Sequence, residues 1–196
     1  GLFCLAIFCL TAAGHYVGDG LFIYETSESL VLDQSVVIGQ RVHHWPGDFV
    51  SGQAGTLQPS VSKYDIGMVL AEVPLLATGH LIAKAIPQLP HDHVTMLLAA
   101  MTNVWICALA VTLFFLFLIQ AGLSRRGALG WSVALAFASP LWTYAKVGFR
   151  EPLALLFLIG LLPALLSAKQ RSSHAWWRDA LVVGFCVGGM LATRLS

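Results

Sequence analysis

The sequence contains little charge. Lys, Arg, Asp and Glu make up 11% of the 196 residues, whereas 57% are hydrophobic, and the mean hydropathy is +0.76. A soluble domain carries about 25% charged residues, so this composition argues against one and predicts an integral membrane protein. The formal net charge is only +1 and no block of Lys or Arg occurs, which excludes a nucleic-acid-binding face.

The four cysteines lack the spacing of a metal site or a disulfide framework. Cys4, Cys9, Cys107 and Cys186 all lie inside apolar runs, and no Cys-x-x-Cys pair occurs. We therefore expect buried, free thiols.

Long apolar runs predict an all-α fold, a helical bundle with about five membrane spans. The spans are expected at 1–17, 94–121, 128–145, 152–168 and 180–196. Because both ends of the chain fall in apolar runs, we expect residues 1–196 to be the N-terminal part of one transmembrane domain in a longer protein. The first run also fits a signal peptide, since Ala12-Ala13-Gly14 resembles a cleavage site, but the further spans favour a membrane helix.

Residues 18–92 interrupt the apolar pattern and are expected to form a large extracytoplasmic loop with juxtamembrane helices. Within it, 66–86 is mostly apolar but carries Asp65, Glu72, His80 and Lys84 near helical spacing, so these residues share one stripe. The pattern fits an interfacial helix or a kinked span with a polar seam.

Basic residues indicate the orientation. Two connections carry them and are therefore expected in the cytoplasm: Arg125 and Arg126 in one, and Lys169, Arg171 and Arg178 in the other. The hairpin 146–151 between them, the sequence His91-Asp92-His93 and the 18–92 loop then lie outside. Segment 66–86 is expected not to cross the membrane completely.

Acidic residues of the outer loop are the first candidates for chemistry. Asp19 lies between Gly18 and Gly20, so it is either a general base or cation ligand approached closely by substrate, or the acid of a Gly-Asp-Gly turn. Glu25 and Glu28 are expected to be solvated charges on one helix face, although either acid could support a cation together with Asp19.

Basic residues of the same side are candidates for binding a phosphate. Lys63 neutralises a lipid phosphate or extends to the membrane surface. Arg150 and Glu151 precede a span and form an interfacial ion pair or part of a site. Arg194 ends an apolar run, where an arginine is a functional candidate.

Histidine spacing does not predict a metal site. The pairs His43-His44 and His91/His93 have no Cys or carboxylate partner at a recognisable ligand spacing.

Three stretches carry a resemblance to a known family. The first is Gly18-Asp19-Gly20 followed by residues 24–30. The second is the segment 62–67, which begins Ser62-Lys63-Tyr64. The third runs from residues 139–142 through the hairpin to Leu153. In this order, with Leu191-Ala192-Thr193-Arg194 at the end, they resemble the GT-C superfamily of polyprenyl-phosphate-dependent membrane glycosyltransferases. The likeness is to the protein O-mannosyltransferase and aminoarabinose-transferase branch.

The resemblance implies inverting transfer of a sugar from a polyprenyl-phosphate donor to a glycan, lipid or protein acceptor at the outer face of the membrane. Asp19 would be the general base, and Glu151 would order the site. Lys63, Arg150 and Arg194 would bind the donor phosphate. Tyr24 and Tyr64, which lie in the matching stretches, are expected to contact substrate.

This chain departs from the family at two positions. Gly20 stands where relatives often carry a second acidic residue, and Ser62 stands where some carry a metal-binding Glu. The need for a divalent cation is therefore open, as are the sugar and the acceptor. A bacterial inner membrane is expected, because the loops are short and the outer loop has no Asn-x-Ser/Thr sequence. Two alternatives are a flippase or transporter of lipid-linked sugars and a non-catalytic membrane subunit.

Overall fold

This computed structural model describes residues 1–12, 19–37, 50–51, 61–62, 66–170 and 176–193. The described residues are mostly helical, in α1 (Leu2–Thr11), α2 (Asp19–Asp33), α3 (Ile66–Ala85), α4 (His91–Gln120), α5 (Arg125–Phe137), α6 (Leu141–Tyr144), α7 (Glu151–Gln170) and α8 (Trp176–Ala192). The two-residue strands β1 (Val50–Ser51) and β2 (Val61–Ser62) pair antiparallel. The expectation of a helical fold is confirmed.

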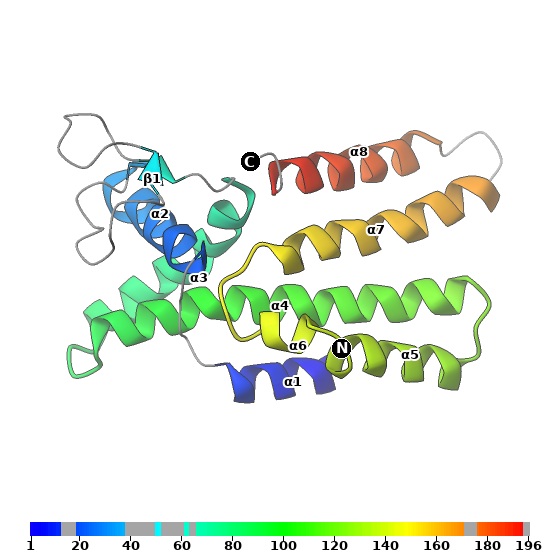
Figure 1. The fold of residues 1–196 in the computed structure, drawn as a ribbon, viewed down its shortest axis with the longest axis horizontal. Helices are drawn as coiled ribbons and strands as arrows, with labels where there is room; N and C mark the ends of the chain where they lie inside the picture. The colour runs from blue at the N-terminus through cyan, green and yellow to red at the C-terminus, as the bar shows by residue number, and fades with distance from the viewer. Residues whose placement is uncertain (13–18, 38–49, 52–60, 63–65, 171–175, 194–196) are drawn as a thin grey trace.

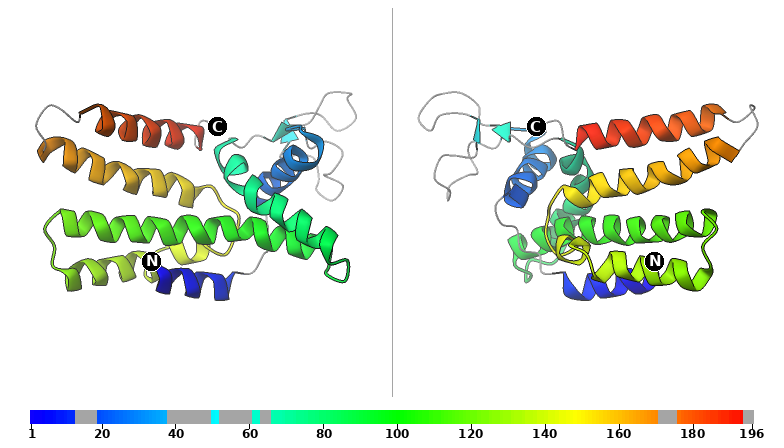
Figure 2. Two further views of the ribbon diagram at one scale, coloured as in Figure 1. Left: turned by 180° about the vertical axis from the view of Figure 1, so that it is seen from behind. Right: turned by 45° about the vertical axis from the view of Figure 1, so that its right-hand side comes forward.

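Helix α4 is the axis of the molecule. Its 30 residues extend over roughly 45 Å at the usual helical rise. Helices α1 and α5 lie along one side of α4, and α7 followed by α8 lies along the other (Figure 1). Helix α3 instead crosses the beginning of α4, and α2 packs on α3 there, as Figure 2 shows from two further sides.

Small side chains on α4 allow its neighbours to approach closely. Ala99, Ala100, Ala108 and Ala110 are all buried. At the crossing with α3, a Cβ atom on Gly79 would lie 3.1 Å from the Cα atom of Thr95. Close backbone contact of this kind is typical of helices that associate in a membrane, where the hydrophobic effect does not drive them together.

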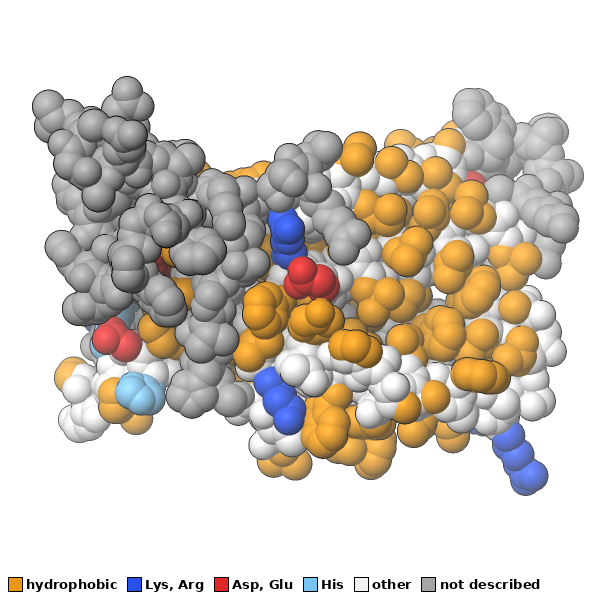
Figure 3. Space-filling model, in the orientation of Figure 1, with side chains coloured by type: hydrophobic (Ala, Val, Ile, Leu, Met, Phe, Trp, Pro, Cys, Tyr) orange, Lys and Arg blue, Asp and Glu red, His pale blue; other side chains and the backbone are white. Residues whose placement is uncertain are grey.

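Two of the helices, α3 and α4, are long and apolar enough to cross a membrane. The outer faces of the other bundle helices are also apolar, with strongly exposed side chains such as Phe3, Trp131 and Phe185. Hydrophobic side chains cover most of the visible surface over α7 and α8 (Figure 3). An apolar surface of this extent indicates contact with a membrane or another apolar partner.

The segment expected to form one span at 128–145 is divided into two helices. Helix α5 ends at Phe137 after 13 residues, fewer than the roughly 20 that a helix needs to cross a bilayer. Pro140 cannot donate a backbone hydrogen bond. The hydroxyl of Ser139 donates to the Leu135 carbonyl (2.6 Å) and accepts from the Leu141 N–H (3.1 Å), which satisfies the backbone at the break.

The other helices lie near their expected ranges. Helix α4 begins at His91, three residues before the expected span, so the polar residues 91–93 form its first turn. Helix α7 covers 151–170 and contains Pro163. Helix α8 begins at Trp176, earlier than the expected start at 180.

The described basic residues of the two predicted cytoplasmic connections lie at one end of the bundle. The connection from α4 to α5 carries Arg125 and Arg126, and α8 carries Arg178 in its first turn. Figure 1 places the α4–α5 connection and the start of α8 at the same end, and the turn before α7 at the opposite end. We call the end with the turn before α7 the junction end.

A glycine-to-alanine pair tests the contact between α3 and α8. At Gly67 a Cβ atom would lie 2.7 Å from the Ala192 carbonyl oxygen, whereas nothing lies within 4 Å of a Cβ atom at Gly130. We expect Gly67→Ala to lower stability by about 1–3 kcal/mol through overpacking. Gly130→Ala should leave stability unchanged or raise it slightly. Thermal unfolding in detergent measures both, and equal effects of the two substitutions would refute the close α3–α8 contact.

Candidate functional site

Two predicted catalytic residues begin two helices that meet at the junction end. Asp19 is the first residue of α2, and Glu151 is the first residue of α7. Phe22, one turn into α2, belongs to the same buried cluster as Leu153 in the first turn of α7. The starts of α2 and α7 therefore pack on one buried cluster, and the joint role of Asp19 and Glu151 in one site stays a prediction.

Glu151 is one of the residues that line a cavity at the start of α7. The cavity has a volume of about 180 Å³ and is also lined by Ser139, Pro140, Leu141, Tyr144, Pro152 and Leu155. The Glu151 Oε2 atom is buried and has no hydrogen-bond partner within the described part of the chain. A buried carboxylate oxygen of this kind is a candidate acceptor for a ligand hydroxyl or a ligand to a cation.

Asn103 on α4 holds the turn that precedes Glu151. Its side chain is fully buried, and its Nδ2 atom donates to the carbonyls of Val147 (2.6 Å) and Phe149 (2.8 Å). The position of Arg150 and Glu151 therefore depends on a polar side chain in the middle of the longest helix. Asn103 is not among the residues predicted from the sequence, although an amide in an apolar helix is itself a signal of a polar contact between elements.

A buried carboxylate lies between α2 and α3. Glu72 is fully buried. Its Oε2 atom lies 3.2 Å from the hydroxyl of Ser27, which also lies 2.8 Å from the Ile23 carbonyl oxygen. Ile23 and Ser27 are four residues apart, so they share the face of α2 that packs on α3. The polar stripe expected on α3 thus includes a residue that faces α2.

A second group of polar contacts joins α2, α3 and α4. The Tyr24 hydroxyl lies 2.8 Å from Thr95 Oγ1 and 3.2 Å from Glu28 Oε1. Glu28 in turn lies 3.6 Å from His80 Nε2, and His80 Nδ1 lies 3.1 Å from His91 Nε2. Burial raises the pKa of the Tyr24 phenol above its usual value, so this hydroxyl stays protonated.

The expectation that Glu28 is a solvated surface charge is wrong. Its side chain is 17% exposed, and it contacts both His80 and Tyr24. Glu25 is also only half-buried rather than exposed. Tyr24 itself is buried, with its hydroxyl turned to Thr95 and Glu28, and its predicted role in substrate binding stays a prediction.

Several predicted residues lie outside the described part of the chain. These are Lys63, Tyr64 and Arg194, together with the side chain of Asp19. Their described neighbours nevertheless meet at the junction end. Strand β2, which ends at Ser62, contacts α2. Thr193, which precedes Arg194, lies close to Gly67 on α3. A Cβ atom added to Gly67 would lie 2.8 Å from Thr193 Cγ2.

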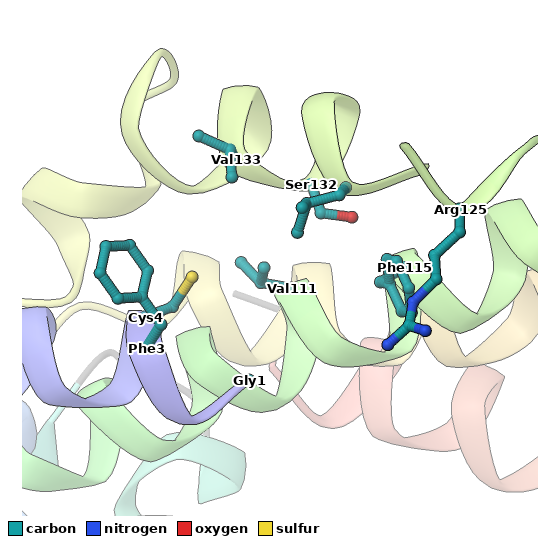
Figure 4. Close-up of a pocket in the computed structure, with 9 residues that line it drawn as sticks. Gly1, Phe3, Cys4, Val111, Phe115, Arg125, Ser132 and Val133 are labelled. Carbon is teal, nitrogen blue, oxygen red and sulfur yellow. The ribbon is translucent and has the colours of Figure 1, made fainter. Parts of the chain in front are cut away.

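Other features of the described residues do not add to this site. No group of three or more His, Cys, Asp or Glu side chains among them could hold a metal ion. The residues His43 and His44 lie outside the described ranges. A second cavity, of about 270 Å³, lies between α1, α4 and α5 near Arg125 and Phe115 (Figure 4), far along the bundle from the junction end.

Comparison of the chain with protein-family models, with curated proteins and with solved structures finds no match.

Replacing Asn103 by leucine tests its role in holding the turn before α7. We expect Asn103→Leu to destabilise the protein by about 1–3 kcal/mol, because two partly buried carbonyls lose their donor. Thr112→Val is the matched control on the same helix, since the Thr112 hydroxyl donates to the Ala108 carbonyl of α4 itself. Thermal unfolding gives the stabilities, and protease cleavage within 146–150 should increase only in Asn103→Leu. Equal cleavage of both variants would refute this role.

Proposed function

We propose that this chain is part of a membrane glycosyltransferase that transfers a sugar from a polyprenyl-phosphate donor to an acceptor at the outer membrane face. The observation that carries the proposal is the meeting of four separate segments at the junction end. These are the start of α2, the start of α7 and the start of α3, which share one buried cluster, and the end of α8, which lies against Gly67 at the start of α3. The residues that resemble the family's motifs lie in or beside these four segments.

A multi-pass arrangement in the membrane supports an outer-face site. Leu2 on α1, Leu116 on α4, Leu158 on α7 and Leu181 on α8 are exposed, and exposed apolar faces on several helices are suited to lipid. The exposed Arg125, Arg126 and Arg178 lie at the end opposite the junction. By the positive-inside rule the junction end then faces the outside, which in a bacterial inner membrane is the periplasm.

The proposed sugar transfer needs one general base and positively charged side chains that bind the donor phosphate. In the proposed step the carboxylate of Asp19 accepts the proton of the acceptor hydroxyl, and that oxygen attacks the anomeric carbon of the donor sugar. The bond between this carbon and the phosphate oxygen breaks from the opposite face, with inversion, and polyprenyl phosphate leaves with the electron pair. Lys63, Arg150 and Arg194 stabilise the phosphate charge.

Glu151 has a supporting role in this proposal. Its buried oxygen, on a residue that lines the cavity, is suited to accept a hydrogen bond from a sugar or acceptor hydroxyl, or to bind a divalent cation near the phosphate. The Tyr24 hydroxyl of α2 is hydrogen-bonded to Thr95 on α4. This contact helps to hold the helix that begins at Asp19 in place.

Replacing Asp19 by asparagine tests the proposed base. Full-length protein in vesicles is supplied with radiolabelled polyprenyl-phosphate sugars, and release and transfer of the sugar are followed. We expect Asp19→Asn to lower turnover by about 10²–10⁴-fold, the usual contribution of a positioned base, while donor binding persists. Asp33→Asn, at the exposed far end of the same helix, should retain full turnover.

The other outcomes of this assay are also decisive. Equal turnover in the parent and in Asp19→Asn removes Asp19 from the mechanism. If the parent shows no turnover but moves lipid-linked sugar between leaflets, the protein is a transporter.

Labelling of cysteines at the two ends of α4 tests the orientation. In a variant without its four native cysteines, His93→Cys and Leu123→Cys each place one exposed thiol beyond opposite ends of the bundle. We expect a membrane-impermeant thiol reagent applied to intact cells to label His93→Cys and to leave Leu123→Cys unmodified until the cells are opened. The reverse pattern would place the junction end in the cytoplasm and contradict the proposal.

A further inference from the structure

The cavity far from the junction end has no role in the proposed sugar transfer. It lies between α1, α4 and α5 (Figure 4). Most of the side chains that line it are apolar: Phe3, Cys4, Val111, Phe115, Leu129 and Val133. The hydroxyl of Ser132, another lining residue, donates to the Ala128 carbonyl of its own helix at 2.8 Å. The interior of the cavity therefore suits hydrocarbon, because a polar molecule would lose its hydrogen bonds there.

The cavity has room for part of a hydrocarbon chain. Its volume is about 270 Å³. An apolar cavity of about 150 Å³ holds one benzene ring, and the same volume per carbon atom gives room here for roughly ten carbon atoms. The lining residues Phe3, Leu129 and Val133 are also exposed on the outside of the bundle. The cavity is thus continuous with the apolar outer surface, and a chain enters it from the lipid side.

Arg125 brings a positive charge to one end of this cavity. In Figure 4 its side chain extends from the start of α5 toward Phe115, whereas Phe3 and Cys4 lie at the other end of the view. Arg125 is exposed, and no described residue forms an ion pair with it. Arg126 follows, and the first turn of α5 has no acidic residue. Since the first turn of a helix also carries a partial positive charge, an anion is favoured at this end.

We propose that this cavity binds an anionic phospholipid of the inner leaflet, with one acyl chain between α1, α4 and α5 and the phosphate against Arg125. Arg125 lies in the connection that the positive-inside rule assigns to the cytoplasmic side, which is the level of the inner headgroups. Basic pockets between membrane helices on this side bind anionic headgroups. The leaflet rests on the orientation argued for the proposed function, whereas the lipid site does not depend on sugar transfer.

The headgroup, rather than the chain, decides which lipid binds. An acyl chain gains little by moving from the bilayer into an apolar cavity, because both surroundings exclude water. The contact between the guanidinium group and a phosphate is charge-assisted, and it is strongest for a lipid with a net negative charge. A zwitterionic lipid carries its own cation beside the phosphate, which competes with Arg125. The site therefore selects anionic over zwitterionic lipid.

Native mass spectrometry of the full-length protein in mild detergent tests this selection. The protein is titrated with phosphatidylglycerol, or with phosphatidylcholine that has the same acyl chains. We expect the parent to bind one phosphatidylglycerol more tightly than phosphatidylcholine. Arg125→Gln should weaken phosphatidylglycerol binding about fivefold, the factor for one basic residue near a membrane surface. Arg178→Gln is the matched control, because Arg178 is exposed in the first turn of α8 at the same end of the bundle and does not line the cavity.

Filling the cavity tests whether the acyl chain enters it. Ser132 is buried and lines the cavity, so Ser132→Phe places a ring inside it and should weaken phosphatidylglycerol binding at least as much as Arg125→Gln. Gly130→Phe adds the same ring to the same helix outside the cavity, since Gly130 is exposed and nothing lies within 4 Å of a Cβ atom there. This control should bind phosphatidylglycerol as the parent does.

Three results would overturn the proposal. Equal affinity of the parent for the two lipids shows that no anion is selected. Equal losses in Arg125→Gln and Arg178→Gln show that the lipid responds only to the total charge of this end. Unchanged binding in Ser132→Phe shows that the lipid lies outside the cavity. If Ser132→Phe fails to fold, Val133→Trp replaces it, because Val133 lines the cavity at a more exposed position, and the same criterion applies.

Discussion

Close packing along α4 is the constraint on which the rest of the structure depends. Three buried clusters of the described residues pack on this helix, and α4 contributes Ala99 and Ala100 to one, Ile106 to another and Ala108 to the third. In a bilayer no water is present to satisfy polar backbone groups, so helices must pair through van der Waals contact. Alanines on α4 and Gly79 on α3 permit this contact, and a larger side chain at these positions would separate the helices that support the junction end.

Polar groups collect where the bundle ends. Along the bundle, the hydroxyls of Thr112 and Ser132 donate to carbonyls of their own helices. At the junction end polar contacts cross between elements instead, as in Ser27 with Glu72 and Tyr24 with Thr95. A site built from carboxylates and cations is favoured here, because the cost of burying charge falls where lipid gives way to water and protein.

Apolar length alone was sufficient to predict most helices. The prediction of a helix over 94–121 needed only an uninterrupted apolar run, and α4 covers that range. The break at Ser139-Pro140 was not predicted, because a proline near the end of a run can either kink a helix or end it. Here the side chain of Ser139 satisfies the backbone on both sides, and this detail depends on the rotamer of one serine.

The polar contacts between helices could not be predicted for a different reason. Ser27 and Glu72 are 45 residues apart, and Asn103 and Val147 are 44 apart. Their pairing depends on how α2 crosses α3 and on where the turn before α7 lies against α4, which are non-local properties. Glu28 illustrates the consequence, since three-residue spacing from Glu25 resembles a solvated helix face until α3 brings His80 against it.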